Sequence, residues 1–139
     1  MLAPVGRSAL LYLAAAVSDF YLPESQLAEH KIQSDEGTLT LRLEPVPKVI
    51  QPLVKQWCPD ATIVSFKLET DETVLLAKAR KALAKYQHQA VIANLLTERR
   101  QRVTIVRDGE EDLVITANPE EEEIEEKIVD GLIKLFYQD

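Results

Sequence analysis

Three apolar runs separated by segments of helical character constrain the fold of this chain most strongly. Residues 11–17, 61–68 and 90–93 are rich in Leu, Val, Ile and Ala, and runs of this length are typical of strands buried on both faces. Helical patterns over 47–58 and 72–86 lie between them. Because a crossover between parallel strands is right-handed and is usually made by a helix, this alternation predicts a parallel sheet with helices on its faces.

An antiparallel hairpin is predicted after the third run. Residues 102–106 and 113–116 flank Asp108 and Gly109, a pair that favours a tight turn because glycine accepts positive φ. The expected fold class is therefore α/β, a Rossmann-like parallel sheet flanked by helices with an added antiparallel hairpin.

Two helix starts have recognisable signals. Thr70 or Asp71 is suited to cap the helix over 72–86. Asn118 is expected to cap the last helix, with Pro119 at its first position and Glu121 placed for a capping box. The last helix then carries an apolar stripe that faces the core, formed by Ile124, Ile128, Leu132 and Leu135.

The organisation before the second run is less regular. Residues 1–10 show no periodicity and predict a poorly ordered leader, with one domain over 11–139. The connection over 18–37 is long for a compact domain, and loops of this length are often lids. Residues 38–43 alternate apolar and polar side chains, which predicts a strand with one covered face that closes the lid.

Charge and cysteine content exclude several classes of function. The net charge is −7, but residues 110–139 hold eleven acidic and two basic residues, which leaves +2 on residues 1–109. This distribution lacks the continuous basic footprint of a nucleic-acid-binding protein. Single Cys58 allows no internal disulfide and, with isolated His30 and His88, no zinc motif. No apolar run is long enough for a membrane span, and a cytoplasmic location is expected.

Asp19 and Lys31 are the first candidates for ligand binding. Asp19 follows the first apolar run, and ligands bind in open α/β sheets at the carboxyl ends of the strands. A lysine ammonium suits phosphate oxygens, and a carboxylate beside it suits a divalent metal or a hydroxyl. The pair predicts a phosphate-bearing ligand. The alternative interpretation is an aspartate that caps a turn and a solvated lysine.

Four sequence blocks in one order resemble the phosphopantothenate-cysteine ligase family. They are AAAVSDFY at 14–21, EHKIQS at 29–34, SFKLET at 65–70 and VIAN at 91–94. The residues in these blocks resemble those of the eukaryotic branch of the family. In that branch the nucleotide is usually ATP, whereas the bacterial enzymes use CTP. The resemblance covers the carboxy-terminal portion of that family and lacks its amino-terminal half, which carries a Gly-rich phosphate loop.

The resemblance implies an ATP-dependent ligation in coenzyme A biosynthesis. The carboxylate of 4′-phosphopantothenate attacks the α-phosphate of the nucleotide, and the amine of cysteine then attacks the acyl-nucleotide. Such a protein mainly aligns substrates and stabilises charge at the α-phosphate, with Mg²⁺ on the phosphate oxygens. The resemblance also implies a homodimer and no tightly bound organic cofactor. The alternative function is a non-catalytic dimerisation or regulatory fragment, in which strand 38–43 serves the interface.

The motifs also assign individual residues. Lys31 matches the lysine of the EKI-type motif and is the expected catalytic phosphate clamp. Asp19 is placed at the nucleotide sugar or the metal, and the backbones of Ala15 and Ala16 near the nucleotide. Ser18, where bacterial members often have Ala, and the Gln-Ser pair after Ile32 depart from the bacterial pattern.

Four further residues complete the expected nucleotide site. They are Phe66, Lys67, Lys81 and Asn94. Lys78 is the alternate to Lys81. For each, an ordinary structural role competes with ligand binding: core packing for Phe66, a solvated surface position for the lysines and a turn for Asn94. The glutamates at 120–123 are expected to be a solvated helix start.

Overall fold

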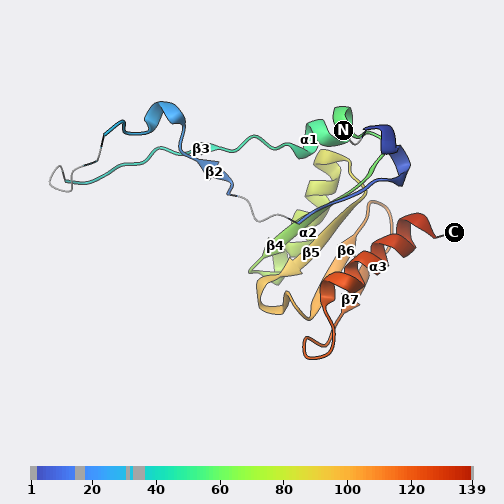
Figure 1. Cartoon of the computed structure of the whole chain (residues 1–139). Coiled ribbons are helices and arrows are strands. Elements are labelled where there is room, and N and C mark those ends of the chain that lie inside the picture. The colour runs from blue at the N-terminus through green and yellow to red at the C-terminus, as the bar shows by residue number, and fades with distance from the viewer. Residues whose placement is uncertain (1–2, 15–17, 31, 33–36, 139) are drawn as a thin grey trace. The chain divides into compact units, whose positions relative to one another are not determined.

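A computed structural model of the chain divides into two compact units. It describes residues 3–14, 18–30, 32 and 37–138. The first unit comprises residues 1–15 and 50–139, and the second comprises residues 16–49. The larger unit contains the sheet and its covering helices (Figure 1).

The first unit contains a five-stranded mixed sheet. Its strands are β1 Leu10–Leu13, β4 Thr62–Glu69, β5 Ala90–Leu95, β6 Arg102–Val106 and β7 Leu113–Thr116, in the order β1-β4-β5-β6-β7. The pairs β1–β4 and β4–β5 are parallel, and β5–β6 and β6–β7 are antiparallel. This arrangement confirms the predicted α/β class, including the antiparallel hairpin at the end of a parallel sheet.

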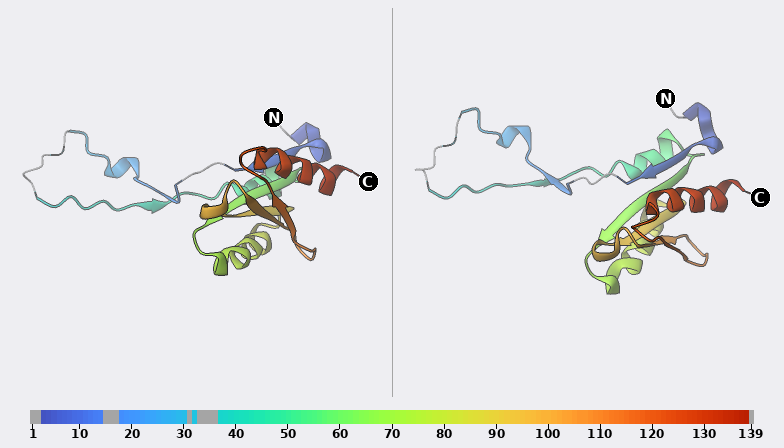
Figure 2. Two further views of the ribbon diagram at one scale, coloured as in Figure 1. Left: turned by 90° about the horizontal axis from the view of Figure 1, so that it is seen from below. Right: turned by 60° about the horizontal axis from the view of Figure 1, so that its bottom comes forward.

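Helices cover both faces of this sheet. The larger ones are α2 Glu72–Tyr86 and α3 Ile124–Tyr137, preceded by a short α1 Ile50–Pro52 that continues into the π-helix η4 Leu53–Trp57. The 3₁₀-helices in this unit are η1 Ala3–Ser8 and η5 Leu96–Glu98. Figure 2 shows α2 and α3 on opposite faces of the sheet. No helix within the described ranges is both long and apolar enough to cross a membrane.

The alternation of side chains along the strands divides the core into layers. Val64 and Ile92 pack with the α3 residues Ile128 and Leu132 on one face. On the other face, Val91 packs with Ala79 of α2. Because successive strand residues point to opposite faces, neighbouring residues of β5 belong to different layers. The predicted stripe on the last helix is confirmed, since Ile124, Ile128 and Leu132 are buried and Leu135 packs against them.

The segment from β4 to β7 follows the sequence prediction closely. Helix α2 has the predicted bounds, and Asp71 is its cap, since its carboxylate accepts a hydrogen bond of 2.9 Å from the Thr73 N–H. In the hairpin, Gly109 has a φ of 70°, the left-handed conformation that glycine adopts without strain. Cys58 is buried as a free thiol.

The start of the last helix differs from the prediction. Helix α3 begins at Ile124, not at Pro119. The N–H groups of Glu121 and Glu122 donate to the Asn118 carbonyl, and the Asn118 side chain accepts from the Glu120 N–H. Glu122, and not Glu121, accepts from the Asn118 N–H. These local bonds form a turn that competes with helix formation, so the exposed glutamates precede the helix.

The predicted strand over 38–43 is wrong. The second unit instead contains a two-stranded antiparallel sheet of β2 Phe20–Tyr21 and β3 Glu44–Pro45, with the short 3₁₀-helix η2 Glu24–Gln26 between the two strands in the chain. Leu39, Leu41 and Leu43 are each about half exposed. An alternating pattern stabilises a strand when one face is covered, and none of these leucines is buried.

The first strand and the first helix are shorter than predicted. Strand β1 ends at Leu13 and is only half-buried, because it lies at the edge of the sheet in the described chain. Helix α1 begins at Ile50, not at Pro47. Pro52 therefore occupies the first turn, where its missing N–H leaves no hydrogen bond unmade. Val49 and Trp57, which lie within the predicted helix, are exposed.

Candidate functional site

The carboxyl ends of β4 and β5 form the edge where an open α/β sheet binds ligands. These parallel strands end at Glu69 and Leu95, which are partners in the register. Four of the predicted site residues lie on these two strands or on the helix between them. They occupy both sides of the sheet.

Asn94 is buried near the end of β5. Only 4% of its surface is exposed, and its amide Nδ2 donates to the Arg99 carbonyl at 3.3 Å. Its carbonyl Oδ1 is buried and has no hydrogen-bond partner among the described residues. A buried polar atom without a partner is costly in free energy, and such atoms in folded proteins call for an explanation.

Phe66 lies on the same face of the sheet as Asn94. Phe66 is in register with Ile92, and Leu68 with Asn94, so all four side chains project toward the α3 layer. Phe66 is half-buried against the core cluster there, and Leu68 is exposed. The packing role expected for Phe66 is confirmed by these contacts, and its role in ligand binding remains a prediction.

Lys67 lies on the opposite face, next to a shared carboxylate. The Glu69 carboxylate is 3.2 Å from the Lys67 ammonium and 2.8 Å from the Lys78 ammonium. The hydrogen bond from Lys78 is the largest cause of a lowered pKa for Glu69. Lys78 also interacts electrostatically with the Asp71 carboxylate. The two ammonium groups therefore lie among two carboxylates at the carboxyl edge.

Lys81 is exposed on α2. Of the two α2 lysines named from the sequence, the alternate Lys78 shares a carboxylate with Lys67. The assignment of a phosphate contact to Lys81 remains a prediction. Arg80, the neighbouring basic residue on α2, pairs with Asp112 at 2.7 Å.

Asp19 lies in the second unit and is exposed. It forms an ion pair with Lys48, a lysine that the motif-based assignment missed, because nothing in its neighbourhood of the sequence indicates it. The backbone carbonyl of Asp19 accepts a hydrogen bond of 2.9 Å from the Val46 N–H, next to the β2–β3 pair. Ala15, Ala16 and Lys31 lie outside the described residues, and their predicted roles remain predictions.

His88 forms a buried polar pair that sequence reasoning did not predict. Its Nε2 is 2.8 Å from the Ser65 hydroxyl, and only 5% of its surface is exposed. Burial lowers the pKa of His88 to about 4, so the ring is neutral at physiological pH. Ser65 and His88 are far apart in sequence, and no spacing signal links them.

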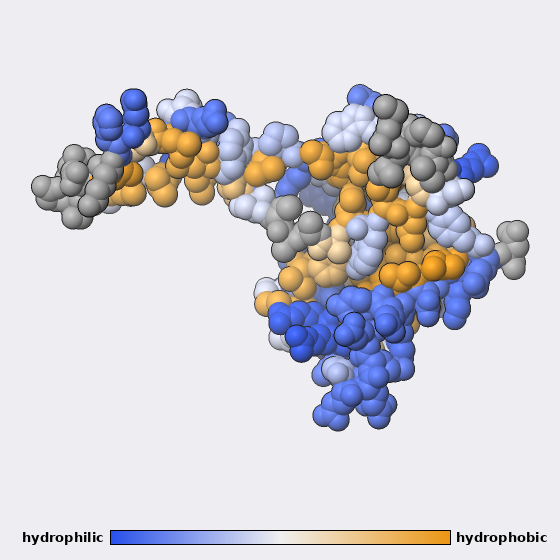
Figure 3. Space-filling model, viewed as in Figure 1, coloured by the Kyte–Doolittle hydropathy of each residue, from blue (hydrophilic) through white to orange (hydrophobic). Residues whose placement is uncertain are grey.

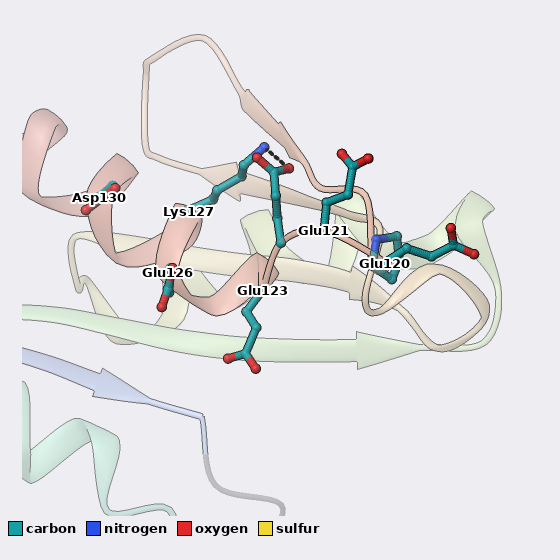
Figure 4. A pocket seen from close by; sticks show the side chains of 8 residues that line it. Glu120, Glu121, Glu123, Glu126, Lys127 and Asp130 are labelled. Carbon is teal, nitrogen blue, oxygen red and sulfur yellow. Dashed lines mark ion pairs between the residues drawn. The ribbon is translucent and has the colours of Figure 1, made fainter.

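The acidic segment before α3 lines a shallow depression of about 670 Å³. Figure 4 shows the Glu121 and Glu123 carboxylates pointing in different directions, and Lys127 in an ion pair. Among the residues with described positions, no group of three or more His, Cys, Asp or Glu is arranged to hold a metal ion. The exposure of the glutamates at 120–123 agrees with the interpretation of this segment as solvated.

Comparison with known families gives a match over most of the chain. Residues 1–132 match the model of the DNA/pantothenate metabolism flavoprotein C-terminal domain. Human phosphopantothenate–cysteine ligase is 54% identical over 132 residues, which are 93% of this chain and 42% of that protein. The chain thus spans less than half the length of this curated relative.

Solved structures give the same picture. A Cab2 mutant in complex with phosphopantothenate-cysteine has a TM-score of 0.82 and 44% sequence identity, covering 91% of this chain and 44% of that one. The DNA/pantothenate metabolism flavoprotein from Streptococcus pneumoniae has a TM-score of 0.68 and 29% identity, covering 91% and 63% of the two chains.

Proposed function

Because this chain belongs to the DNA/pantothenate metabolism flavoprotein C-terminal domain family, we propose that it forms the nucleotide-binding part of a phosphopantothenate–cysteine ligase. The activity requires the amino-terminal half that the family resemblance implies. The substrates are 4′-phosphopantothenate, cysteine and a nucleoside triphosphate. The free, buried thiol of Cys58 is compatible with work in the reducing cytoplasm.

The reaction proceeds in two transfers. The phosphopantothenate carboxylate attacks the α-phosphate, and pyrophosphate leaves with the electron pair of the broken P–O bond. The cysteine amine then attacks the acyl carbon, loses a proton and displaces the nucleoside monophosphate. Neither step needs a protein nucleophile, so alignment and charge stabilisation account for catalysis. Lys31 is the proposed clamp on the α-phosphate.

The orphan carbonyl of Asn94 is the observation that supports this proposal most. Its Oδ1 has no partner among described atoms, and it lies at the edge where nucleotides bind in open α/β sheets. Once the enclosed Asn94 amide becomes accessible at this edge, an exocyclic amino group of a base could donate the missing hydrogen bond. The ring of Phe66 on the same face could stack on that base. Adenine and cytosine both carry such an amino group. The resemblance to the eukaryotic branch favours ATP.

The phosphates require cations. The ammonium groups of Lys67 and Lys78, which flank Glu69 at the same edge, are the proposed contacts to the phosphates. Mg²⁺ commonly binds through phosphate oxygens, waters and one or two carboxylates, and Asp19 is the proposed protein ligand. Its exposed carboxylate, paired with Lys48, fits such a minimal role, and the bound ion would neutralise charge on the triphosphate.

A second candidate function is homodimerisation without catalysis. Leu39, Leu41 and Leu43 expose apolar surface in the second unit, and Figure 3 shows apolar residues gathered along it. Exposed apolar residues that gather in one segment are a feature of interaction sites. A homodimer through this segment is compatible with the enzymatic role as well as with a regulatory fragment.

Calorimetry and sedimentation separate the two functions. The nucleotide-binding role predicts saturable heat on titration of the chain with MgATP and a loss of that heat in Asn94→Ala. The regulatory role predicts a concentration-dependent dimer in equilibrium sedimentation and no heat of nucleotide binding. A monomeric chain that binds no nucleotide, alone or with the amino-terminal half, would rule out both.

A further inference from the structure

The turn after β5 carries two arginines that the proposed ligase site does not use. Strand β5 ends at Leu95, and η5 Leu96–Glu98 leads into Arg99 and Arg100, which are both exposed. The backbone carbonyl of Arg99 accepts the 3.3 Å hydrogen bond from the Asn94 amide. This bond places the turn at the carboxyl edge of the sheet, next to the proposed nucleotide contact.

These arginines differ from the other basic residues at this edge in their ion pairing. Lys67, Lys78 and Arg102 are each held by a carboxylate in an ion pair. Neither Arg99 nor Arg100 forms an ion pair with any residue that the structure describes. An anion can therefore bind their guanidinium groups without breaking an existing ion pair.

Both arginines line a depression that is rich in hydrogen-bond donors. It has a volume of about 370 Å³, and its lining also includes Thr97 with a hydroxyl and Gln101 with an amide. The one acidic residue among its described lining residues is Glu98, whose carboxylate binds Arg102 at 2.7 Å. Guanidinium groups with neighbouring neutral donors, and no free carboxylate, suit the oxygens of a phosphoryl group.

Arg99 is better placed than Arg100 to bind such an anion. Arg100 also lines a neighbouring depression with Glu122, Glu123 and Glu125. Those carboxylates compete for the charge of Arg100 and repel an anion. Arg99 lines the donor-rich depression and is not among the residues of this acidic one.

We propose that Arg99 binds the phosphoryl group of one of the phosphorylated substrates in the donor-rich depression, an inference that rests on the proposed function. Both 4′-phosphopantothenate and a nucleoside triphosphate carry a terminal phosphoryl group. A guanidinium recognises such a group through parallel hydrogen bonds from its planar fork. Arg99 is then a further substrate-binding residue, outside the set that the sequence motifs predict.

Inorganic phosphate is the probe for the site itself. The 139-residue chain is titrated with phosphate at constant ionic strength, with sodium chloride making up the balance, and backbone amide shifts are followed by two-dimensional NMR. Saturable shifts are expected at Arg99 and in the turn over 96–101. Arg99→Gln should weaken phosphate binding at least about fivefold. The bond to Asn94 should persist in this variant, because its acceptor is a backbone carbonyl.

Two further variants make the test specific. Lys134→Gln makes the same change in net charge at an exposed position in the last turn of α3, and it should leave phosphate affinity unchanged. Arg100→Gln should weaken phosphate binding less than Arg99→Gln. A larger effect of Arg100→Gln, or an equal effect of Lys134→Gln, would contradict the assignment to Arg99.

Competition identifies which substrate supplies the phosphoryl group. MgATP and 4′-phosphopantothenate are added separately to the phosphate-saturated chain, alone and together with the amino-terminal half of the human relative. The substrate that occupies the depression should reverse the phosphate shifts. Its own affinity, measured by calorimetry, should fall in Arg99→Gln.

The inference and the proposed function fail in different ways. A chain that binds MgATP but shows no saturable phosphate shift at Arg99 overturns the inference alone. The same holds if phosphate binds equally to the wild type and Arg99→Gln, or if neither substrate displaces it. A chain that binds no MgATP, alone or with the amino-terminal half, contradicts the proposed function, whatever its affinity for phosphate.

Discussion

At the scale of single residues, Asn94 connects the structure with the proposed chemistry. Its position at the end of an apolar run was visible in the sequence, because the carboxyl ends of parallel strands are predictable from alternation. Its orphan Oδ1 was not visible, because the amide's partner is the Arg99 carbonyl, in a loop that no pattern specifies. The Ser65–His88 pair was likewise hidden, since it joins a residue of β4 to the segment that precedes β5.

Substitution of Asn94 should weaken nucleotide binding without unfolding the protein. Asn94→Ala removes the acceptor, and we expect MgATP affinity to fall at least about tenfold in calorimetry. Lys85→Ala, an exposed α2 substitution near the opposite end of the sheet from this edge, is the control and should leave affinity unchanged. Equal affinity of Asn94→Ala and the wild type would remove Asn94 from the site.

His88 should make the fold sensitive to mild acid. The pKa of His88 is lowered to about 4 in the folded state, and the unfolded value is near 6.5. The unfolded state then binds more protons between these values, so stability is complete above the unfolded pKa and is lost as the pH falls. From about pH 7 to about pH 5 we expect a loss of roughly 2 kcal/mol in the free energy of unfolding.

Urea denaturation at both pH values measures this loss. In His88→Asn most of the difference between the two pH values should disappear. His30→Asn, at an exposed histidine, serves as the control and should behave like the wild type. A wild-type stability that does not change across this window would contradict the buried, neutral state of His88.

At the scale of elements, caps and hydrophobic periodicity predicted a helix or strand correctly where the element also packs against a neighbouring layer. Helix α2 had a cap, a periodic pattern and a strand on each side, and its bounds were predicted correctly. For the leucines at 39, 41 and 43, the alternation of apolar and polar residues was the only signal that favoured a strand. Without a covering layer in the described unit, this pattern formed no strand. At Asn118 the side chain favoured a turn over a helix start, although both are compatible with the same residue types.

The cap of α2 should contribute measurably to stability. Asp71 accepts hydrogen bonds from the backbone N–H and the hydroxyl of Thr73. Asp71→Ala is expected to lower the free energy of unfolding by about 1 kcal/mol. Asp60→Ala, at an exposed turn, is the matched control in the same denaturation experiment. If the two variants were equally stable, the cap would have no energetic role.

At the scale of the whole molecule, the residues proposed for the nucleotide site lie on both faces of one sheet edge. Phe66 and Asn94 lie on one face of the sheet, and Lys67 lies on the other with Lys78. The relation of Lys31 and Asp19 to this edge remains the main prediction from the motifs. Sequence resemblance supplied the family and its chemistry, whereas no local pattern in this chain indicates the second half of the site.

Reconstituted turnover tests this account most directly. The chain is mixed with the amino-terminal half of the human relative, and pyrophosphate release is measured with ATP, 4′-phosphopantothenate and cysteine. We expect release that requires both halves and 4′-phosphopantothenate, and that is abolished by Lys31→Ala. A folded complex of the two halves that releases no pyrophosphate, or normal turnover by Lys31→Ala, would contradict the account.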